Sequence, residues 1–188
     1  MRRALELAAK GLFTTTPNPR VGCVLVQEGR VVGEGWHERA GGAHAEAAAL
    51  AAARGDAKGA TAYVTLEPCN HHGRTPPCAA ALVEAGVARV VAAMRDPNPE
   101  AAHGADTLRA AGIAFESGLL EDEARELNIG FVSRVTSGRP WVRMKAAATL
   151  DGRTAMADGR SQWITGEAAR LDGHRWRARA CAILTGIG

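Results

Sequence analysis

Apolar and polar positions follow two different periodicities in the first part of the chain. The start, MRRALELAAKGLF, carries apolar residues at the three-to-four spacing of an amphipathic helix. Residues 21–36, VGCVLVQEGRVVGEGW, have the pattern of two strands that turn at Glu28 and Gly29. The alanine-rich stretch 43–55 has helical periodicity and ends at Gly55. The pattern therefore predicts a helix, a β-hairpin and a second helix.

Strand and helix patterns then alternate along the chain. Short apolar runs predict strands, and the segments between them predict helices, one of which has two prolines in its first turn. The predicted strands are 60–68, 88–99 and 113–118, and the predicted helices are 76–87 and 104–112. This alternation is typical of an α/β fold in which helices pack on a mixed sheet.

The pattern changes near residues 136–140. A helix is predicted from Glu121 to Val135, and TSGRP then supplies the glycine and proline of a linker. We therefore predict two domains, 1–138 and 139–188. The second has a predicted strand, helix and strand over about 141–155, 167–178 and 181–188. So short a unit cannot bury enough apolar surface to fold alone, which predicts an incomplete domain.

Composition disfavours several classes of function. The formal net charge is +3, and acids and bases alternate without a basic block, so no nucleic-acid partner is expected. No apolar run is long enough to cross a membrane, and the N-terminus lacks the apolar core of a signal peptide. We therefore expect a cytoplasmic protein, in which the four cysteines indicate metal binding or catalysis rather than disulfides. Cys23 and Cys181 fall in predicted strands and are expected to be small core residues.

Two segments carry the candidate metal ligands. GGAHAEAAAL places His44 and Glu46 at the start of a predicted helix, and TLEPCNHHGRTPPC places Cys69 and Cys78 after a predicted strand. This is the pattern of zinc nucleobase deaminases, in which one His and two Cys bind Zn²⁺ and the Glu is not a ligand. Three protein ligands leave a fourth position for water, whose pKa zinc lowers to roughly 7. Glu46 would take a proton from that water, protonate a ring nitrogen and finally protonate the departing amine.

Two features of this pattern leave other interpretations open. His44 and Glu46 would diverge inside a helix, so both reach one site only if it lies beyond the helix end. Eight residues separate the two candidate cysteines, whereas the general signature has two. The non-catalytic alternative is a structural zinc site with a fourth protein ligand, for example His71 or His72.

The long loop between the cysteines matches one family. Together with TPNPRVGCVLV, GEGWHERAGGAHAE and DPNP, it closely resembles the RibD family of bifunctional riboflavin-biosynthesis deaminases/reductases. The resemblance implies a cytidine-deaminase-like three-layer α/β/α sandwich, followed by the incomplete start of a dihydrofolate-reductase-like α/β domain. It also implies zinc-dependent hydrolytic deamination of 2,5-diamino-6-(5-phosphoribosylamino)pyrimidin-4-one to 5-amino-6-(5-phosphoribosylamino)uracil and ammonia.

The resemblance assigns roles to residues of the deaminase part. Glu46 is implied as the proton donor and acceptor, and Asn18 as the residue that holds the pyrimidine edge. The implied zinc ligands are His44, Cys69 and Cys78. We further hypothesise that Arg74, in the cationic loop between the cysteines, contacts the substrate phosphate.

The reductase part of the resemblance rests on LDGRTAMADGRSQWITG and RARACAILTG. It places Ala147 and Trp163 where the family binds NADP, and Ser161 and Arg177 where it binds substrate. Because that domain is normally much longer, NADPH binding is expected only if the domain were complete, and no reductase step is expected from this chain. The stretch DPNPEAAHGADTL is one residue shorter than the family's usual loop and lacks its first glycine, so substrate contacts there are expected to differ.

Two alternative functions remain beside this one. Another zinc nucleobase deaminase, acting on tRNA adenosine, cytosine or guanine, is disfavoured by the cysteine spacing and by an aromatic content of 4%. A non-catalytic zinc scaffold would need a fourth protein ligand. The expected assembly is a homo-oligomer with a small-molecule phosphoribosylaminopyrimidine substrate and no nucleic-acid or membrane partner.

Overall fold

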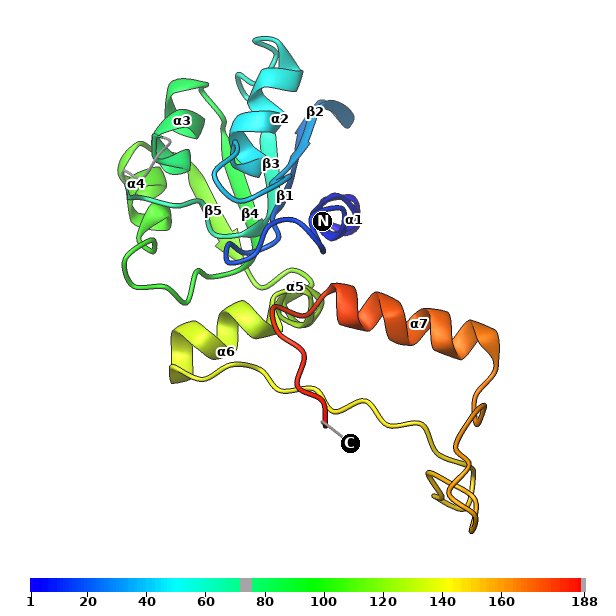
Figure 1. Cartoon of the computed structure of the whole chain (residues 1–188). Helices are drawn as coiled ribbons and strands as arrows, with labels where there is room; N and C mark the ends of the chain where they lie inside the picture. Colours follow the sequence, from blue (N-terminus) through cyan, green and yellow to red (C-terminus); the bar gives the residue numbers. More distant parts are fainter. Residues whose placement is uncertain (72–75, 187–188) are drawn as a thin grey trace. The chain divides into compact units, whose positions relative to one another are not determined.

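The computed structural model of the chain describes residues 1–71 and 76–186. It divides into two compact units, Met1–Trp141 and Val142–Gly188 (Figure 1). The predicted linker, 136–140, lies directly before this division. Within the described ranges, no helix has both the length and the apolar character needed to cross a bilayer.

Five strands form one mixed sheet in the first unit, in the order β2-β1-β3-β4-β5. The strands are β1 (Gly22–Gln27), β2 (Arg30–Trp36), β3 (Thr61–Leu66), β4 (Arg89–Met94) and β5 (Ala114–Ser117). β1 pairs antiparallel with both β2 and β3, whereas β3, β4 and β5 are parallel. The prediction of a mixed α/β sheet is confirmed. Because β3 and β4 are parallel, the segments that follow them emerge at the same edge of the sheet, where α/β proteins place their ligand sites.

Helices cover both faces of this sheet (Figure 1). On one face lie α2 (Ala45–Ala53), α3 (Cys78–Glu84) and α4 (Gly104–Ala110), and on the other lie α1 (Arg2–Ala9) and α5 (Glu121–Leu127). Side chains of a strand alternate between the two faces. Accordingly, Cys23 belongs to the core cluster with the alanines of α2, whereas its neighbour Val24 packs against α1. The three-layer α/β/α sandwich implied by the family resemblance is therefore present.

The hairpin of β1 and β2 allows α2 to approach the sheet closely. Glu28 and Gly29 have positive φ values of 49° and 77°, as expected of a two-residue type I′ turn. At Gly33 and Gly35 of β2, an added Cβ would collide with the backbone of Ala49. Small residues on both elements thus let α2 pack directly on the hairpin, and this packing fixes where the helix begins.

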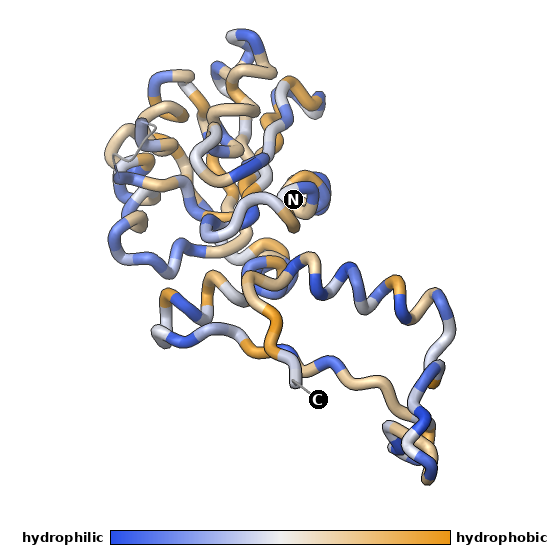
Figure 2. Tube along the Cα trace, viewed as in Figure 1, coloured by the Kyte–Doolittle hydropathy of each residue, from blue (hydrophilic) through white to orange (hydrophobic). Residues whose placement is uncertain are grey.

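The core of the first unit lies between the sheet and its helices. Figure 2 shows the central strands among the most hydrophobic segments of this unit. Fully buried large side chains include Leu25, Val64, Leu82, Val90 and Leu108. Burying each such side chain contributes about 1.5–3 kcal/mol, so the strand and helix ends that carry the site rest on a well-packed core.

The single helix predicted from Glu121 to Val135 is wrong, because the structure has two helices there. α5 ends at Leu127, α6 spans Ile129–Ser137, and Asn128 lies between them. Asn128 is fully buried. Its side chain accepts a hydrogen bond from the Arg20 backbone N–H and donates one to the Arg20 carbonyl oxygen. Contacts with so distant a segment fix the break, and they leave no trace in local periodicity.

The second unit has one helix among its described residues. α7 spans Glu167–Ala178, as predicted. The strands predicted at 141–155 and 181–188 are wrong for the residues that the structure describes, which have no strand there. A strand needs a neighbour for its backbone hydrogen bonds, and one strand–helix–strand unit buries too little apolar surface to hold that pairing. Large apolar side chains such as those of Met144 and Leu150 are accordingly exposed.

Candidate metal centre and active site

The candidate metal ligands lie at the ends of three regular elements. His44 is the N-cap of α2, with an extended backbone (φ −73°, ψ 159°), and Glu46 lies in the first turn of that helix. Cys69 follows the carboxyl end of β3, and Cys78 is the first residue of α3. Because His44 precedes the helix rather than lying inside it, the divergence of side chains two positions apart in a helix does not apply.

Three donor atoms converge at this point. His44 Nδ1 lies 3.2 Å from Cys78 Sγ and 3.5 Å from Cys69 Sγ, and all three atoms lie within 4.8 Å of one another. Tetrahedral zinc, with Zn–S of about 2.3 Å and Zn–N of about 2.0–2.1 Å, would separate neighbouring N and S ligands by about 3.6 Å. The donor set and its spacing therefore fit Zn²⁺. Within residues 1–71 and 76–186, no fourth His, Cys, Asp or Glu belongs to this group.

The cysteine pair is electrostatically prepared to bind a cation. A hydrogen bond with the Cys78 side chain lowers the pKa of Cys69 to about 4, against the effect of burial and with help from His44 and the Cys78 backbone N–H. The same contact, with burial, raises the pKa of Cys78. The hydrogen bond with Cys69 raises the pKa of His44. The thiolate is the form that ligates zinc, and Cys69 is already in this form at neutral pH. A bound cation would favour loss of the proton from the Cys78 thiol as well.

Glu46 is a buried carboxyl group next to these donors. Only 4% of the residue is exposed. Burial is the main cause that raises its pKa to about 7, and the charge of Cys69 adds to it. A carboxyl group with a pKa near 7 both accepts and donates a proton at neutral pH. Glu46 therefore has the properties that proton transfer beside the metal requires.

His44, Glu46 and Cys69 line a cavity of about 230 Å³. This volume is slightly below the range of roughly 300–1,000 Å³ that is usual for small-molecule sites. The remaining wall comes from the segment 17–21, from His37, from the chain around Cys69 including Leu66, Glu67 and His71, from the loop after β4 and from α6. The cavity thus joins the metal ligands to segments that sequence patterns alone did not connect.

Asn18 faces this cavity in an orientation set by His37. The Nδ1 atom of His37 lies 2.9 Å from the Ala43 carbonyl oxygen, to which it must donate. His37 Nε2 is then the acceptor for the Asn18 side-chain amide, 3.1 Å away. His37 is 4% exposed, and its ring packs edge-on against that of His44, with 5.6 Å between centroids. The Asn18 side-chain NH₂ group thus donates one hydrogen to His37. The side-chain carbonyl oxygen of Asn18 can then accept a hydrogen bond from a ligand.

The loop after β4 adds two polar residues that the sequence analysis did not assign to the site. Asp96 and Asn98 both line the cavity, and the Asn98 backbone N–H donates to Asp96 Oδ1 at 2.9 Å. Burial raises the pKa of Asp96 to about 6. The parallel pairing of β3 and β4 brings this loop beside Cys69. That pairing was the available signal, since polar residues directly after two neighbouring parallel strands meet at one edge.

α6 closes another side of the cavity through Phe131 and Arg134. The Arg134 side chain reaches the Pro17 carbonyl oxygen at 3.4 Å. Asn128, at the start of this helix, holds the backbone of Arg20 by two hydrogen bonds of 2.7 and 2.9 Å. The segment that carries Asn18 is therefore fixed to α6, a role of Asn128 that the sequence analysis missed.

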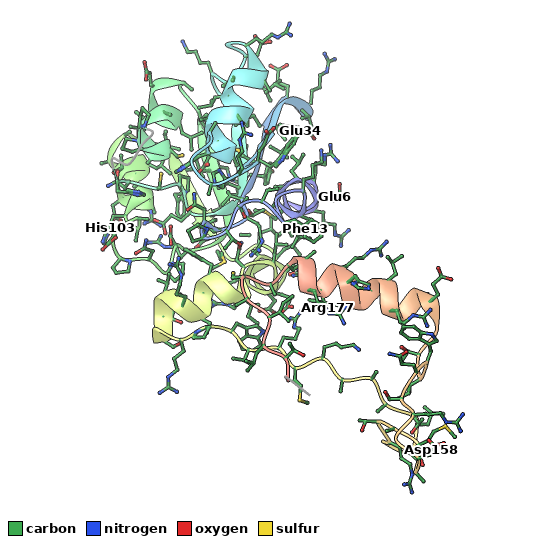
Figure 3. The ribbon with its side chains drawn as sticks, viewed as in Figure 1. Glu6, Phe13, Glu34, His103, Asp158 and Arg177 are labelled. Atoms are coloured by element: carbon green, nitrogen blue, oxygen red, sulfur yellow. The ribbon has the colours of Figure 1, made fainter. Side chains whose placement is uncertain are left out.

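The other predicted residues lie elsewhere. Cys23 is fully buried, as predicted, whereas Cys181 is exposed, so its assignment to the core is wrong because no strand forms around it. In the second unit, Arg177 lies on α7 (Figure 3), and Trp163 stacks with Arg170 at 4.4 Å. Ser161 is exposed and Ala147 is half-buried. Arg74 and His72 lie outside the described residues, and His71 is exposed at the cavity.

A three-ligand zinc site beside a buried glutamate with a pKa near 7 gives the first unit the fold and site of a zinc-dependent nucleobase deaminase. The model of the cytidine and deoxycytidylate deaminase zinc-binding region matches residues 1–94, and the chain belongs to this family. The model of the RibD C-terminal domain matches residues 140–188.

Relatives that match nearly the whole chain are riboflavin biosynthesis proteins. RibD of Haemophilus influenzae is 59% identical over 186 residues, which are 98% of this chain and 50% of that protein. Acinetobacter baumannii RibD has a TM-score of 0.89 at 55% identity over 96% of this chain and 51% of its own. A Thermotoga maritima structure has a TM-score of 0.90 at 47% identity and covers 94% of this chain and 51% of its own. It is that of a diaminohydroxyphosphoribosylaminopyrimidine deaminase/5-amino-6-(5-phosphoribosylamino)uracil reductase. This chain spans about half the length of these relatives.

Proposed function

We propose that the chain catalyses hydrolytic deamination of 2,5-diamino-6-(5-phosphoribosylamino)pyrimidin-4-one, with release of ammonia. The observation that carries this proposal is the convergence of His44, Cys69 and Cys78 beside Glu46 on a small cavity. The substrate is inferred from the Thermotoga protein, whose name states a deaminase acting on this class of pyrimidine.

The residues divide the chemistry between them. His44, Cys69 and Cys78 would hold Zn²⁺, which when bound lowers the pKa of water and so supplies a nucleophile at neutral pH. Glu46 takes a proton from the attacking water and gives it to a ring nitrogen. It then takes the second proton, from the hydroxyl group that the water leaves on the ring carbon, and gives it to the departing amine as the C–N bond breaks and the C=O bond forms. Its pKa of about 7 suits both directions of transfer. The exchange of an amino group for an oxygen consumes one water and yields one ammonia, so no further co-reactant is needed.

The cavity wall would hold the pyrimidine in place. Asn18 offers a carbonyl oxygen whose direction is fixed through His37. Asp96 and Asn98 offer acceptor and donor groups on the loop after β4. Amide and carboxyl groups of this kind match the amino and carbonyl groups of a diaminopyrimidinone. We also propose that Arg74 contacts the substrate phosphate, in which case Arg74→Ala raises KM.

The non-catalytic alternative predicts a closed zinc site with four protein ligands. Among the described residues three donors converge, and His71, one of the two candidate fourth ligands, is not one of them. The other candidate, His72, lies outside the described residues. A set of three protein ligands is the one that the hydrolytic alternative requires. The assignments of Ala147 and Trp163 to NADP and of Ser161 and Arg177 to a reductase substrate stay predictions. Homo-oligomer formation, the absence of nucleic-acid partners and a cytoplasmic location are likewise proposals.

The test is a comparison of substrates with the zinc-loaded protein. Ammonia release is measured with the diaminopyrimidine ribotide, cytidine, deoxycytidylate and guanine at equal concentrations. We expect turnover with the ribotide at least about tenfold above that with any other compound, since phosphate and exocyclic groups together provide several specific contacts. Preferred turnover of cytidine, deoxycytidylate or guanine would contradict the assigned substrate, and a lack of turnover with all four would favour the zinc scaffold.

A further inference from the structure

Glu67 is a buried carboxylate to which the proposed chemistry assigns no role. It directly follows β3, two positions before Cys69, and only 2% of the residue is exposed. Burying a carboxylate is unfavourable unless its oxygens receive hydrogen bonds. The contacts of Glu67 therefore indicate what this residue does.

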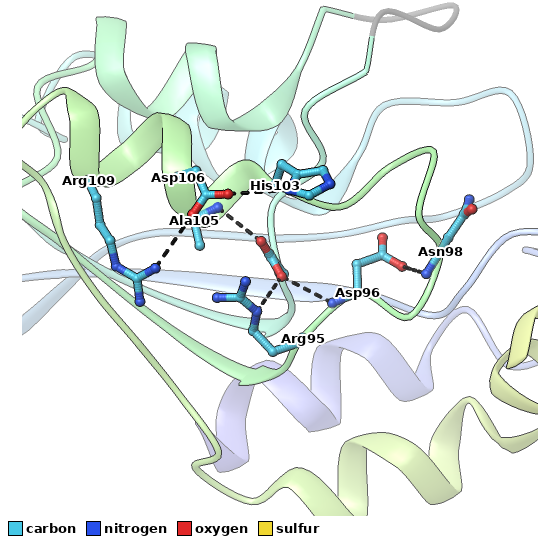
Figure 4. Close-up of polar contacts among 8 residues, drawn as sticks. Arg95, Asp96, Asn98, His103, Ala105, Asp106 and Arg109 are labelled. Carbon is cyan, nitrogen blue, oxygen red and sulfur yellow. Dashed lines mark hydrogen bonds and ion pairs between the residues drawn. The ribbon is translucent and has the colours of Figure 1, made fainter.

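Both carboxylate oxygens bind groups from the segment 95–105. Oε2 lies 2.9 Å from the Arg95 Nε atom and accepts the Asp96 backbone N–H at 3.3 Å. Oε1 accepts the Ala105 backbone N–H at 3.0 Å. In Figure 4, dashed lines join Arg95, Asp96 and Ala105 to one unlabelled carboxylate, and the contacts given above identify it as that of Glu67. One side chain thus contacts both ends of the segment, the first two residues after β4 and the start of α4.

The segment between these two contacts carries part of the cavity wall. Asp96, Asn98 and Ala101 line the cavity. The chain next to Glu67 supports the same segment, since the Asn70 backbone N–H donates to the Ala101 carbonyl oxygen at 3.0 Å. At Gly104 an added Cβ would collide with the Pro68 carbonyl oxygen. The stretch that bears Cys69 is therefore the surface on which the loop is held.

Glutamate is the side chain that suits these partners. All three groups that face it are donors, two backbone N–H groups and a guanidinium, and an ionised carboxylate is a pure acceptor. Hydrogen bonds that involve an ionised group are roughly twice as strong as neutral ones. Glutamine would turn one acceptor into an NH₂ group that faces another donor, so it could hold only one end of the loop.

We propose that Glu67 is a positioning residue that fixes both ends of the segment 95–105, so that Asp96 and Asn98 face the substrate next to the metal ligands. This inference rests on the proposed function. Glu67 itself lines the cavity, but both of its carboxylate oxygens are engaged by the segment 95–105, so its role is to position that segment. It couples the stretch after β3 that carries Cys69 to the loop proposed to contact the pyrimidine.

The first test is the kinetics of Glu67→Gln with the diaminopyrimidine ribotide. Loss of the loop position weakens substrate binding in the ground and transition states alike, so we expect KM to rise at least tenfold while kcat stays within about threefold. Zinc content should stay at that of the wild-type protein. The matched control is Glu116→Gln on β5, which makes the same side-chain change but removes only an exposed ion pair with Arg89, and should change KM less than twofold.

A lowered melting temperature with unchanged KM in Glu67→Gln would mean a purely structural role and would overturn the proposal. If that variant does not fold, Glu67→Asp keeps the charge but is one methylene too short to reach both ends. A raised KM is then expected, and wild-type KM would overturn the proposal equally.

A second readout does not depend on activity. Hydrogen exchange of the Asp96 and Ala105 amides reports directly on the two backbone contacts. We expect both amides to exchange at least tenfold faster in Glu67→Gln than in the wild-type protein, and unchanged protection would contradict the proposal. If no deamination is found at all, the proposed function fails, while this measurement still decides whether Glu67 holds the loop.

Discussion

The two sides of the cavity are built in different ways. The metal corner, defined as His44, Glu46, Cys69 and Cys78, lies at the ends of α2, β3 and α3, whose positions follow from core packing. The pocket wall, defined as Asn18, Asp96, Asn98, Phe131 and Arg134, lies largely in irregular segments. Those segments are held by two buried polar side chains, Glu67 and Asn128. The comparison indicates that the core sets the chemistry, whereas distant polar contacts set how a substrate is held.

The largest effect is expected at the metal corner. Cys78→Ala removes one of three zinc ligands, and we expect loss of bound zinc and of detectable deamination, because no other described donor can replace it. Metal analysis together with ammonia release checks this. The matched control is Cys23→Ala, a buried thiol outside the ligand set, which should keep about one zinc per chain. Full zinc content in Cys78→Ala would show that the ligand set is wrong.

A smaller and different effect is expected at the pocket wall. Asn128→Asp keeps an acceptor for the Arg20 N–H but places a carboxylate oxygen against the Arg20 carbonyl. The segment with Asn18 should shift, and KM should rise about tenfold with unchanged zinc, since a lost buried hydrogen bond costs about 1–3 kcal/mol. Ser133→Ala on α6 removes only an exposed hydrogen bond to Arg139 and serves as the control. A wild-type KM in Asn128→Asp would contradict the proposal that distant polar contacts at the pocket wall determine how the substrate is held.

The pocket wall also predicts a pH dependence of stability. The pKa of Asp96 is raised by burial from 3.8 to about 6, so the folded state binds this proton more tightly than the unfolded state does. Stability therefore falls as pH rises from about 4 to about 6, and the deficit remains at higher pH. Asp96→Asn should abolish this deficit, at most about 3 kcal/mol, and raise the melting temperature at pH 8 but not at pH 4. An equal shift at both pH values would refute the linkage.

The smallest effect is expected far from both sides. The carboxylate of Glu34 on β2 pairs with Arg3 of α1 at 2.8 Å on the surface. Figure 3 labels Glu34 and also Glu6, which lies on α1. Glu34→Gln should cost less than about 1 kcal/mol and leave zinc content and KM unchanged. A change in KM would mean that substrate binding depends on surface charge in general, and would contradict the assignment of substrate binding to the specific contacts of the pocket wall.

The sequence predicted the metal corner better than the pocket wall, for a physical reason. His44, Glu46, Cys69 and Cys78 form a local pattern whose chemistry can be read without a fold, and β-α alternation placed them on the right elements. Glu67 and Asn128 have no such pattern, because their partners are backbone groups 29, 38 and 108 residues away. The strands predicted in the second unit failed for a related reason, since a strand depends on a neighbour that local periodicity cannot supply.

The most direct test of the central claim is Glu46→Gln, a change that preserves size and removes the titratable group. Zinc content, melting temperature and ammonia release from the diaminopyrimidine ribotide are measured on the same preparation. Proton transfer by such a group is worth about 10²–10⁴ in rate, so the account predicts about one zinc per chain, a folded protein and a loss of activity of at least a hundredfold. Deamination within tenfold of the wild-type rate, with zinc bound, would contradict it.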